Sequence, residues 1–185
     1  QLKGRIVYAT GGHGWTYYGT TYGWTTQRGV YMGMEEDYGN IDQLNFFVPY
    51  MFNAGATIAA CGRPIGFQTN EVVLSHTNAS GVSFTGSWSV NTTDTVYFGG
   101  SASDRFRYAS LTATATATAT YMPTIPMAGF YPVYTWVPHG ADRGDQLYRV
   151  MHTGGEMQVR VPHYRVGNGW VYLGTYYFNA GANTN

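Results

Sequence analysis

The sequence has 185 residues, of which 17% are aromatic and 11% are charged, whereas about 25% of residues are charged in an average protein. Ten basic and ten acidic side chains cancel to a net charge of zero at pH 7. A chain without a basic surface cannot hold a phosphate backbone, so the composition argues against nucleic-acid binding. No apolar run approaches the roughly 20 residues of a membrane span. The abundance of apolar residues excludes a wholly disordered chain.

The low net charge and the many Tyr and Trp residues also bear on association and location. Charge repulsion keeps many domains apart, so its absence here predicts self-association. The single cysteine, Cys61, cannot form an internal disulfide. The sequence starts at Gln1 without Met, and no charged and apolar leader segment precedes it. We therefore expect a mature chain that is secreted or lies on the cell surface.

The first 60 residues have the pattern of one strand, loop, helix and second strand. Residues 5–9 are a short apolar run before a glycine-rich loop, which is typical of a buried strand. Over residues 37–53 apolar side chains recur at helical spacing, and Pro49 is expected to kink this helix or to split it in two. Gly55 supplies a left-handed helix stop, and residues 56–60 form the second strand. This order predicts a parallel βαβ crossover.

From about residue 71 the pattern contains strands alone, with turn residues at short intervals. We expect strands at residues 82–88, 95–98, 105–108, 130–137, 147–152, 157–161 and 170–178. Strict alternation of Ala and Thr over residues 111–120 predicts one more strand, in preference to a flexible linker. Short strands at this spacing predict an antiparallel β-sandwich. The expected fold class is therefore mostly β, a β-sandwich preceded by a short βαβ segment.

Two residues of the first unit are candidate zinc ligands. His13 follows the first strand within Gly11-Gly12-His13-Gly14, where no bulky side chain blocks a metal, although a hydrogen-bonded turn histidine has the same pattern. Glu36 lies at the start of the predicted helix. It is either the second zinc ligand or an acidic group that complements the helix dipole. With Asn40 and with Asn53-Ala54-Gly55-Ala56, these residues make the segment 4–70 similar to the start of a zinc-dependent N-acetylmuramoyl-L-alanine amidase.

The amidase resemblance implies that His13 and Glu36 bind zinc, that a second His completes the site and that a late Glu activates the metal-bound water. Ser75-His76-Thr77-Asn78 matches the Ser-x-His-x-Asn pattern of that second His, but residues 61–71 leave no room for the helix that precedes it. Catalytic zinc sites generally need three protein ligands and an open position. We therefore do not expect His76 to complete the site, and we expect a vestigial site with no catalytic residue and no cofactor. Bound zinc is the alternative.

Residues 71–181 resemble the golvesin C-terminal-like domain. The motifs that carry this resemblance are Gly81-Val82-Ser83-Phe84-Thr85-Gly86-Ser87-Trp88, Gly129-Phe130-Tyr131-Pro132, Tyr148-Arg149-Val150-Met151-His152 and Gly169-Trp170-Val171-Tyr172. The resemblance implies a β-sandwich and places His76 in the segment that leads into it. We accordingly divide the chain into an incomplete amidase-like segment, residues 1–70, and a golvesin-type β-sandwich, residues 71–185.

Aromatic residues are concentrated in the loop after the first strand. The candidate binding residues there are Trp15, Tyr17, Tyr18, Tyr22 and Trp24. Flat rings with hydroxyl neighbours suit the faces of sugars, and Tyr and Trp are also enriched at subunit contacts. The sequence does not separate these two roles.

Three histidines of the second half of the chain are candidates for a small polar cluster. His139, His152 and His163 fall in different predicted strands or turns, near the acidic and basic residues 142–145. We expect them to be surface loop residues and not a site.

Together these observations favour a non-catalytic protein of the cell envelope or extracellular matrix. It would act by self-assembly into a filament or matrix, or by glycan adhesion. The expected partner is another copy of the chain, or peptidoglycan or another glycan. The alternatives are a zinc-dependent amidase that cleaves peptidoglycan and a carbohydrate-binding module.

Overall fold

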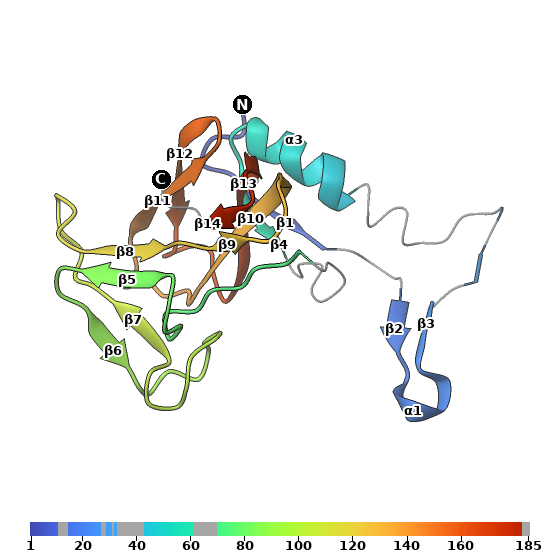
Figure 1. The fold of residues 1–185 in the computed structure, drawn as a ribbon, viewed down its shortest axis with the longest axis horizontal. Helices are drawn as coiled ribbons and strands as arrows, with labels where there is room; N and C mark the ends of the chain where they lie inside the picture. Colours follow the sequence, from blue (N-terminus) through green and yellow to red (C-terminus); the bar gives the residue numbers. More distant parts are fainter. Residues whose placement is uncertain (11–14, 27–28, 31, 33–42, 61–69, 183–185) are drawn as a thin grey trace.

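A computed structural model describes residues 1–10, 15–26, 29–30, 32, 43–60 and 70–182. Strands predominate in these residues, and the predicted mostly β fold class is confirmed. A four-stranded sheet forms the centre of the molecule (Figure 1). Its strands, in order across the sheet, are β1 (Ile6–Ala9), β4 (Thr57–Ala60), β13 (Gly169–Phe178) and β10 (Gly129–Val137). Among the described helices, none is long and apolar enough to cross a membrane.

The central sheet joins the two ends of the sequence. β1 and β4 are parallel, with Val7 opposite Ile58, so the predicted βαβ crossover is confirmed. β4 pairs on its other side with β13, antiparallel, with Tyr172 opposite Ile58. β13 in turn pairs along its length with β10. The sheet therefore crosses residue 70, where the sequence predicts the boundary between an amidase-like segment and a sandwich.

A two-part helix connects β1 to β4. It begins with a π-helical turn, η1 (Gln43–Phe47), which continues as α3 (Val48–Asn53). Pro49 is the second residue of α3, directly after the change from π-helical to α-helical geometry, so the helix changes type at the proline where the sequence predicts a kink or a split. Gly55 has φ +97° and ends the helix as expected. The start of the predicted helix, residues 37–42, lies outside the described residues.

The sheet separates two hydrophobic cores. On one face, α3 packs Val48 against Ile58 and Tyr172. On the other face lies the hairpin of β11 (Asp145–His152) and β12 (Gly155–Pro162), whose Val161 is fully buried against Val171. β4 and β13 are therefore covered on both faces, which explains why their residues are apolar in near-continuous runs.

Short two-stranded pairs surround this centre. They are β5 (Val82–Thr85) with β8 (Thr118–Tyr121), β6 (Ser89–Asn91) with β7 (Phe106–Tyr108), β9 (Thr124–Ile125) with β14 (Gly181–Ala182), and β2 (Trp15–Tyr17) with β3 (Trp24–Thr26). A four-residue helix, α1 (Gly19–Tyr22), lies between β2 and β3.

Two strand predictions need correction. Residues 95–98 are not a strand, and polar side chains accept backbone N–H groups just before this segment and at Val96 within it. Asn91 Oδ1 accepts the N–H groups of Thr93 and Asp94 at 3.1 and 2.8 Å, and Asp94 Oδ1 accepts that of Val96 at 3.1 Å. The Ala and Thr alternation forms a strand from residue 118 onward, whereas residues 111–117 pair with no strand in the described part of the chain.

Candidate functional site

The predicted aromatic binding residues lie on one hairpin. β2 and β3 pair with Trp15 opposite Thr26 and Tyr17 opposite Trp24. Tyr18 and Tyr22 in the connection are 49% and 76% exposed, and α1 has no buried residue. Figure 1 shows this hairpin, residues 15–26, projecting away from the central sheet. The structure thus brings these residues together on one hairpin, while their binding role stays a prediction.

A second aromatic surface lies on the outer side of the two-part helix formed by η1 and α3. Phe46, Phe47 and Tyr50 are 57%, 40% and 69% exposed. We call these three residues the aromatic face. An ordinary surface helix is polar on its outer side. This helix is apolar on both sides. The continuous apolar run Phe46-Phe47-Val48 was the sequence signal from which this surface could have been predicted.

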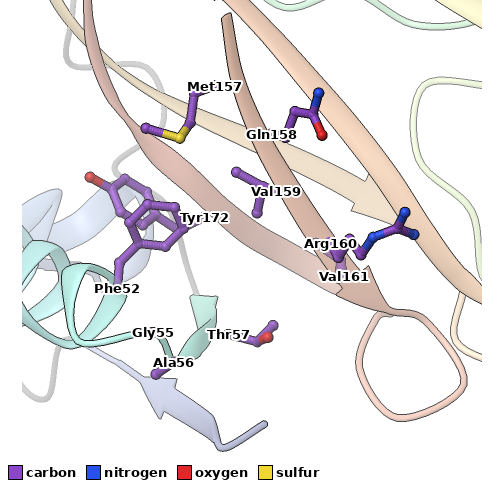
Figure 2. Close-up of a pocket in the computed structure, with 10 residues that line it drawn as sticks. All are labelled: Phe52, Gly55, Ala56, Thr57, Met157, Gln158, Val159, Arg160, Val161 and Tyr172. Carbon is purple, nitrogen blue, oxygen red and sulfur yellow. The ribbon is translucent and has the colours of Figure 1, made fainter. Parts of the chain in front are cut away.

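The inner side of α3 borders a groove that Figure 2 shows in close-up. The groove has a volume of about 200 Å³. One wall is the turn from Gly55 to Thr57, and the opposite wall consists of the consecutive residues 157–161 of β12. Phe52 and Tyr172 meet edge to face between the walls, with ring centroids 5.1 Å apart. Since side chains alternate between the faces of a strand, five consecutive lining residues mean that the groove runs along the edge of β12. We call it the β12 groove.

His76 takes part in a network of polar side chains. Its Nε2 lies 3.0 Å from both Oδ1 and the backbone oxygen of Asp104, and the side chain is 9% exposed. Asp104 Oδ2 accepts a 3.2 Å hydrogen bond from Arg107, whose guanidinium lies over the Phe84 ring at 4.5 Å. The nitrogen that a metal would use is therefore engaged with a protein carboxylate.

The other two candidate zinc ligands, His13 and Glu36, lie outside the described residues. Within the residues that the structure describes, no three His, Cys, Asp or Glu side chains are grouped so that they could hold a metal ion. The ligand roles that the amidase resemblance implies stay predictions.

His163 is a correction to the expectation that the late histidines are surface loop residues. His163 is buried, with 1% of its surface exposed. Nδ1 lies 3.0 Å from the backbone oxygen of Val166, so it carries the proton and donates, and Nε2 accepts a 2.8 Å hydrogen bond from the Tyr148 hydroxyl. The Tyr148 oxygen accepts in turn from Thr135 at 3.3 Å. Sequence reasoning missed this buried chain of hydrogen bonds because its members are far apart in the sequence.

Burial sets the protonation of this chain of hydrogen bonds. Burial lowers the pKa of His163 below its ordinary value of 6.5, the hydrogen bond to Val166 opposes this change, and the nearby Arg143 charge adds to it. Burial likewise raises the pKa of Tyr148. Both groups are therefore neutral at pH 7, which fits a structural role.

The remaining two histidines differ from each other. His139 is exposed in a loop, as expected, and its backbone N–H donates to Asn168 Oδ1 at 2.8 Å. His152 is at the end of β11, where its ring stacks on Tyr176 with centroids 4.7 Å apart, so the loop prediction is wrong for it.

Comparison with known proteins relates most of the chain to one family. The golvesin C-terminal domain model matches residues 72–185. A xanthan lyase from Bacillus sp. (strain GL1) is 30% identical over 112 residues, which are 60% of this chain and 12% of that protein. The solved structure of a Paenibacillus xanthan lyase is 32% identical with a TM-score of 0.53, over 60% of this chain and 10% of the lyase.

These matches cover a small part of the relatives. The chain spans about a tenth of the length of either lyase. The family match begins at residue 72 and leaves out the amidase-like segment, whose resemblance stays a prediction. Since the family model matches more than half of the sequence, the chain belongs to the golvesin C-terminal domain family.

Proposed function

We propose that this chain is a non-catalytic structural module that associates with further copies of itself, in an extracellular or cell-envelope setting. The observation that carries the proposal is the aromatic face. Three large rings, Phe46, Phe47 and Tyr50, are each at least 40% exposed on the outer side of one helix. Contiguous exposed apolar patches on soluble proteins commonly mark sites of protein association.

The free energy available from covering this face is substantial. A half-exposed aromatic side chain has roughly 100 Å² left to bury, worth about 2 kcal/mol. Three such rings on each copy exceed the lower estimates of the cost of association, about 4 kcal/mol. The net charge of zero adds no long-range repulsion between copies.

A non-catalytic role fits the extent of the match to the lyases. The region shared with xanthan lyase is 12% of that protein, so the relation carries no part of a reaction over to this chain by itself. Self-association needs neither a cofactor nor a metal. Cell-envelope location remains part of the proposal.

The association is tested by sedimentation velocity over a range of concentrations. The unaltered chain is expected to form larger species as its concentration rises. The double variant Phe46→Asp and Tyr50→Asp should form smaller species than the unaltered chain at the same concentration, because each substitution puts a charge on the aromatic face. Tyr164→Asp, at a 44% exposed residue in a turn distant from α3 in the sequence, is the matched control and should associate normally. A chain that is monomeric at every concentration contradicts the proposal.

A second function, glycan adhesion, is favoured by the hairpin of residues 15–26. Exposed Tyr18 and Tyr22 offer rings with hydroxyl groups, which suit the faces of sugars. The relative is named for xanthan, a polysaccharide. Retention on immobilised xanthan or peptidoglycan that is lost in Tyr18→Ala with Tyr22→Ala would support this function, and equal retention of the variant would argue against it.

A further inference from the structure

We propose that the β12 groove receives residues 111–117 of a second copy, which add to β12 as an extra strand. The inference shares with the proposed function the premise that copies associate. It goes beyond that function because it assigns a different surface and names the segment that occupies it.

One side of the contact is an unpaired strand edge. In the described part of the chain, β12 pairs with β11 alone. The opposite edge of residues 157–161 borders the groove, and no backbone hydrogen bond joins it to another described element. Such an edge presents a row of N–H and C=O groups that can accept an added strand.

The other side of the contact is the segment 111–117, in which Ala and Thr alternate after Leu111. All but the last of these residues are exposed, and none has a backbone-to-backbone hydrogen bond within the described residues. A 2.6 Å hydrogen bond from the Thr112 hydroxyl to the Thr114 oxygen bends the segment back on itself. Uncharged segments rich in Thr, without Pro or Gly, readily pair with other strands.

The occupant must come from another copy. Figure 1 shows the segment before β8 at the outer end of the β5 and β8 pair. Its first residue, Leu111, lies against Gly144, and Thr116 near its end lies against Gly86. Because the segment is held at these two points, it does not pair with the free edge of β12 in its own chain, while its residues 112–115 are exposed.

The lining of the groove and the side chains of the segment are compatible. The groove has a volume of about 200 Å³, which admits small side chains. Its base is formed by Phe52 and Tyr172, and Met157 and Val159 contribute apolar atoms from the edge strand. Ala and Thr methyl groups can contact these atoms without burying a charge. In strand addition of this kind, main-chain hydrogen bonds supply affinity and side-chain pockets supply specificity.

The geometry of the contact has a consequence for assembly. The groove and the inserted segment are different surfaces, so each copy offers one of each. Such a head-to-tail contact extends into a filament or closes into a ring. The aromatic face, by contrast, can pair with itself in a closed dimer.

The first experiment is disulfide capture between copies. In a Cys61→Ser background, Thr114→Cys is made in one chain and Gln158→Cys in another, and the two are mixed under mild oxidation. We expect a covalent heterodimer that forms faster than either homodimer. Thr93→Cys, at another exposed threonine, is the matched control and should give no such preference. Equal rates for the Thr114→Cys and Thr93→Cys mixtures would overturn the inference.

A second experiment measures association without a cross-link. Ala115→Lys places a charge in the segment that enters the groove, whereas Ala102→Lys places one in an exposed turn. Ala115→Lys should weaken growth beyond the dimer by about tenfold or more, which corresponds to about 1.4 kcal/mol. Ala102→Lys should leave it unchanged, and equal effects of the two would overturn the inference.

The two proposals fail in distinguishable ways. In one outcome, the Thr114→Cys and Gln158→Cys heterodimer also forms when both chains carry Phe46→Asp and Tyr50→Asp. In that case the groove contact is supported and does not depend on the aromatic face. If the chain associates and this association depends on the aromatic face, but no cross-link forms, the groove contact alone is wrong.

Discussion

The Tyr148 hydroxyl donates a 2.8 Å hydrogen bond to Nε2 of His163, deep in the core between the central sheet and the β11 and β12 hairpin. His163 donates from Nδ1 to the Val166 oxygen, so both ring nitrogens have partners in its neutral form. Protonation would turn Nε2 into a donor. It would then face the Tyr148 hydroxyl, which is itself the donor in the neutral form. The pair therefore links the stability of the core to pH.

Stability is expected to fall as the pH falls below about 6.5. Burial lowers the pKa of His163 in the folded state below the unfolded value, so the unfolded chain takes up the proton first. The contribution is fully present above the unfolded pKa and is lost as the pH falls toward the folded pKa. The slope contributed by this residue is at most about 1.4 kcal/mol per pH unit. Urea unfolding between about pH 7.5 and about pH 5.5 measures it.

His139 provides the control for this pH dependence. It is exposed, so His139→Gln should leave the dependence on pH unchanged, whereas His163→Gln should reduce it. If the pH dependence of stability is the same in both variants, it arises from groups other than His163.

Tyr148→Phe removes a hydroxyl from a buried site and leaves Nε2 of His163 without its donor. An unsatisfied buried acceptor costs about 1–3 kcal/mol, so the free energy of unfolding should fall by that amount. Tyr131→Phe is the matched control, because the Tyr131 hydroxyl donates to the Met127 oxygen at an exposed position. Equal losses in the two variants, by urea unfolding at pH 7, would show that the buried chain of hydrogen bonds adds nothing.

Gly174 lies where β13 departs from regular pairing with β10, at the register shift between Val133 and Tyr134. It has φ +120°, and a Cβ there would lie 2.2 Å from the Tyr176 hydroxyl oxygen. Gly155 has a similar φ, +114°, with no atom within 4 Å of such a Cβ. Gly155→Ala should therefore cost backbone strain of about 1–3 kcal/mol, and Gly174→Ala should cost more. Thermal unfolding compares them, and a Gly174→Ala variant as stable as Gly155→Ala would contradict the expected clash.

The shared sheet predicts one unfolding transition for the whole chain. Ile58 belongs to the core under α3, and Val161 belongs to the core under the hairpin; both are 0% exposed. Ile58→Ala should cost about 2–5 kcal/mol and Val161→Ala somewhat less, because a smaller group is removed. Calorimetry should show each variant lowering the temperature of the same single transition. Two transitions that respond separately would mean that residues 1–70 and 71–185 unfold as independent units.

Much of the secondary structure could be predicted because its signal is local. The strands expected at residues 130–137, 147–152, 157–161 and 170–178 all lie within observed strands. The βαβ unit and its stop at Gly55 follow from periodicity and from one glycine. Where polar side chains compete for backbone donors, as Asn91 and Asp94 do, alternation alone misleads.

The partners of these elements could not be predicted. The pairing of β4 with β13 joins residues such as Ala60 and Trp170 that are far apart in the sequence, and nothing in either strand names the other. The burial of His163 depends on Tyr148, which approaches it through this tertiary arrangement. Likewise, the outer side of the helix is left exposed because α3 packs its other side, with Val48, Met51 and Phe52, against the central sheet.

The pairing of β4 with β13 also fixes an order of events during synthesis. β4 leaves the ribosome before β13, and at rates of 5–20 residues per second the intervening chain takes roughly 5–20 s to make. Throughout that interval the newly made β4 has β1 as its one available neighbour among these strands, and Ile58 lacks Tyr172 above it. Until β13 is made, the second edge of β4 therefore lacks its partner strand, and an unpaired edge of this kind can pair with another chain.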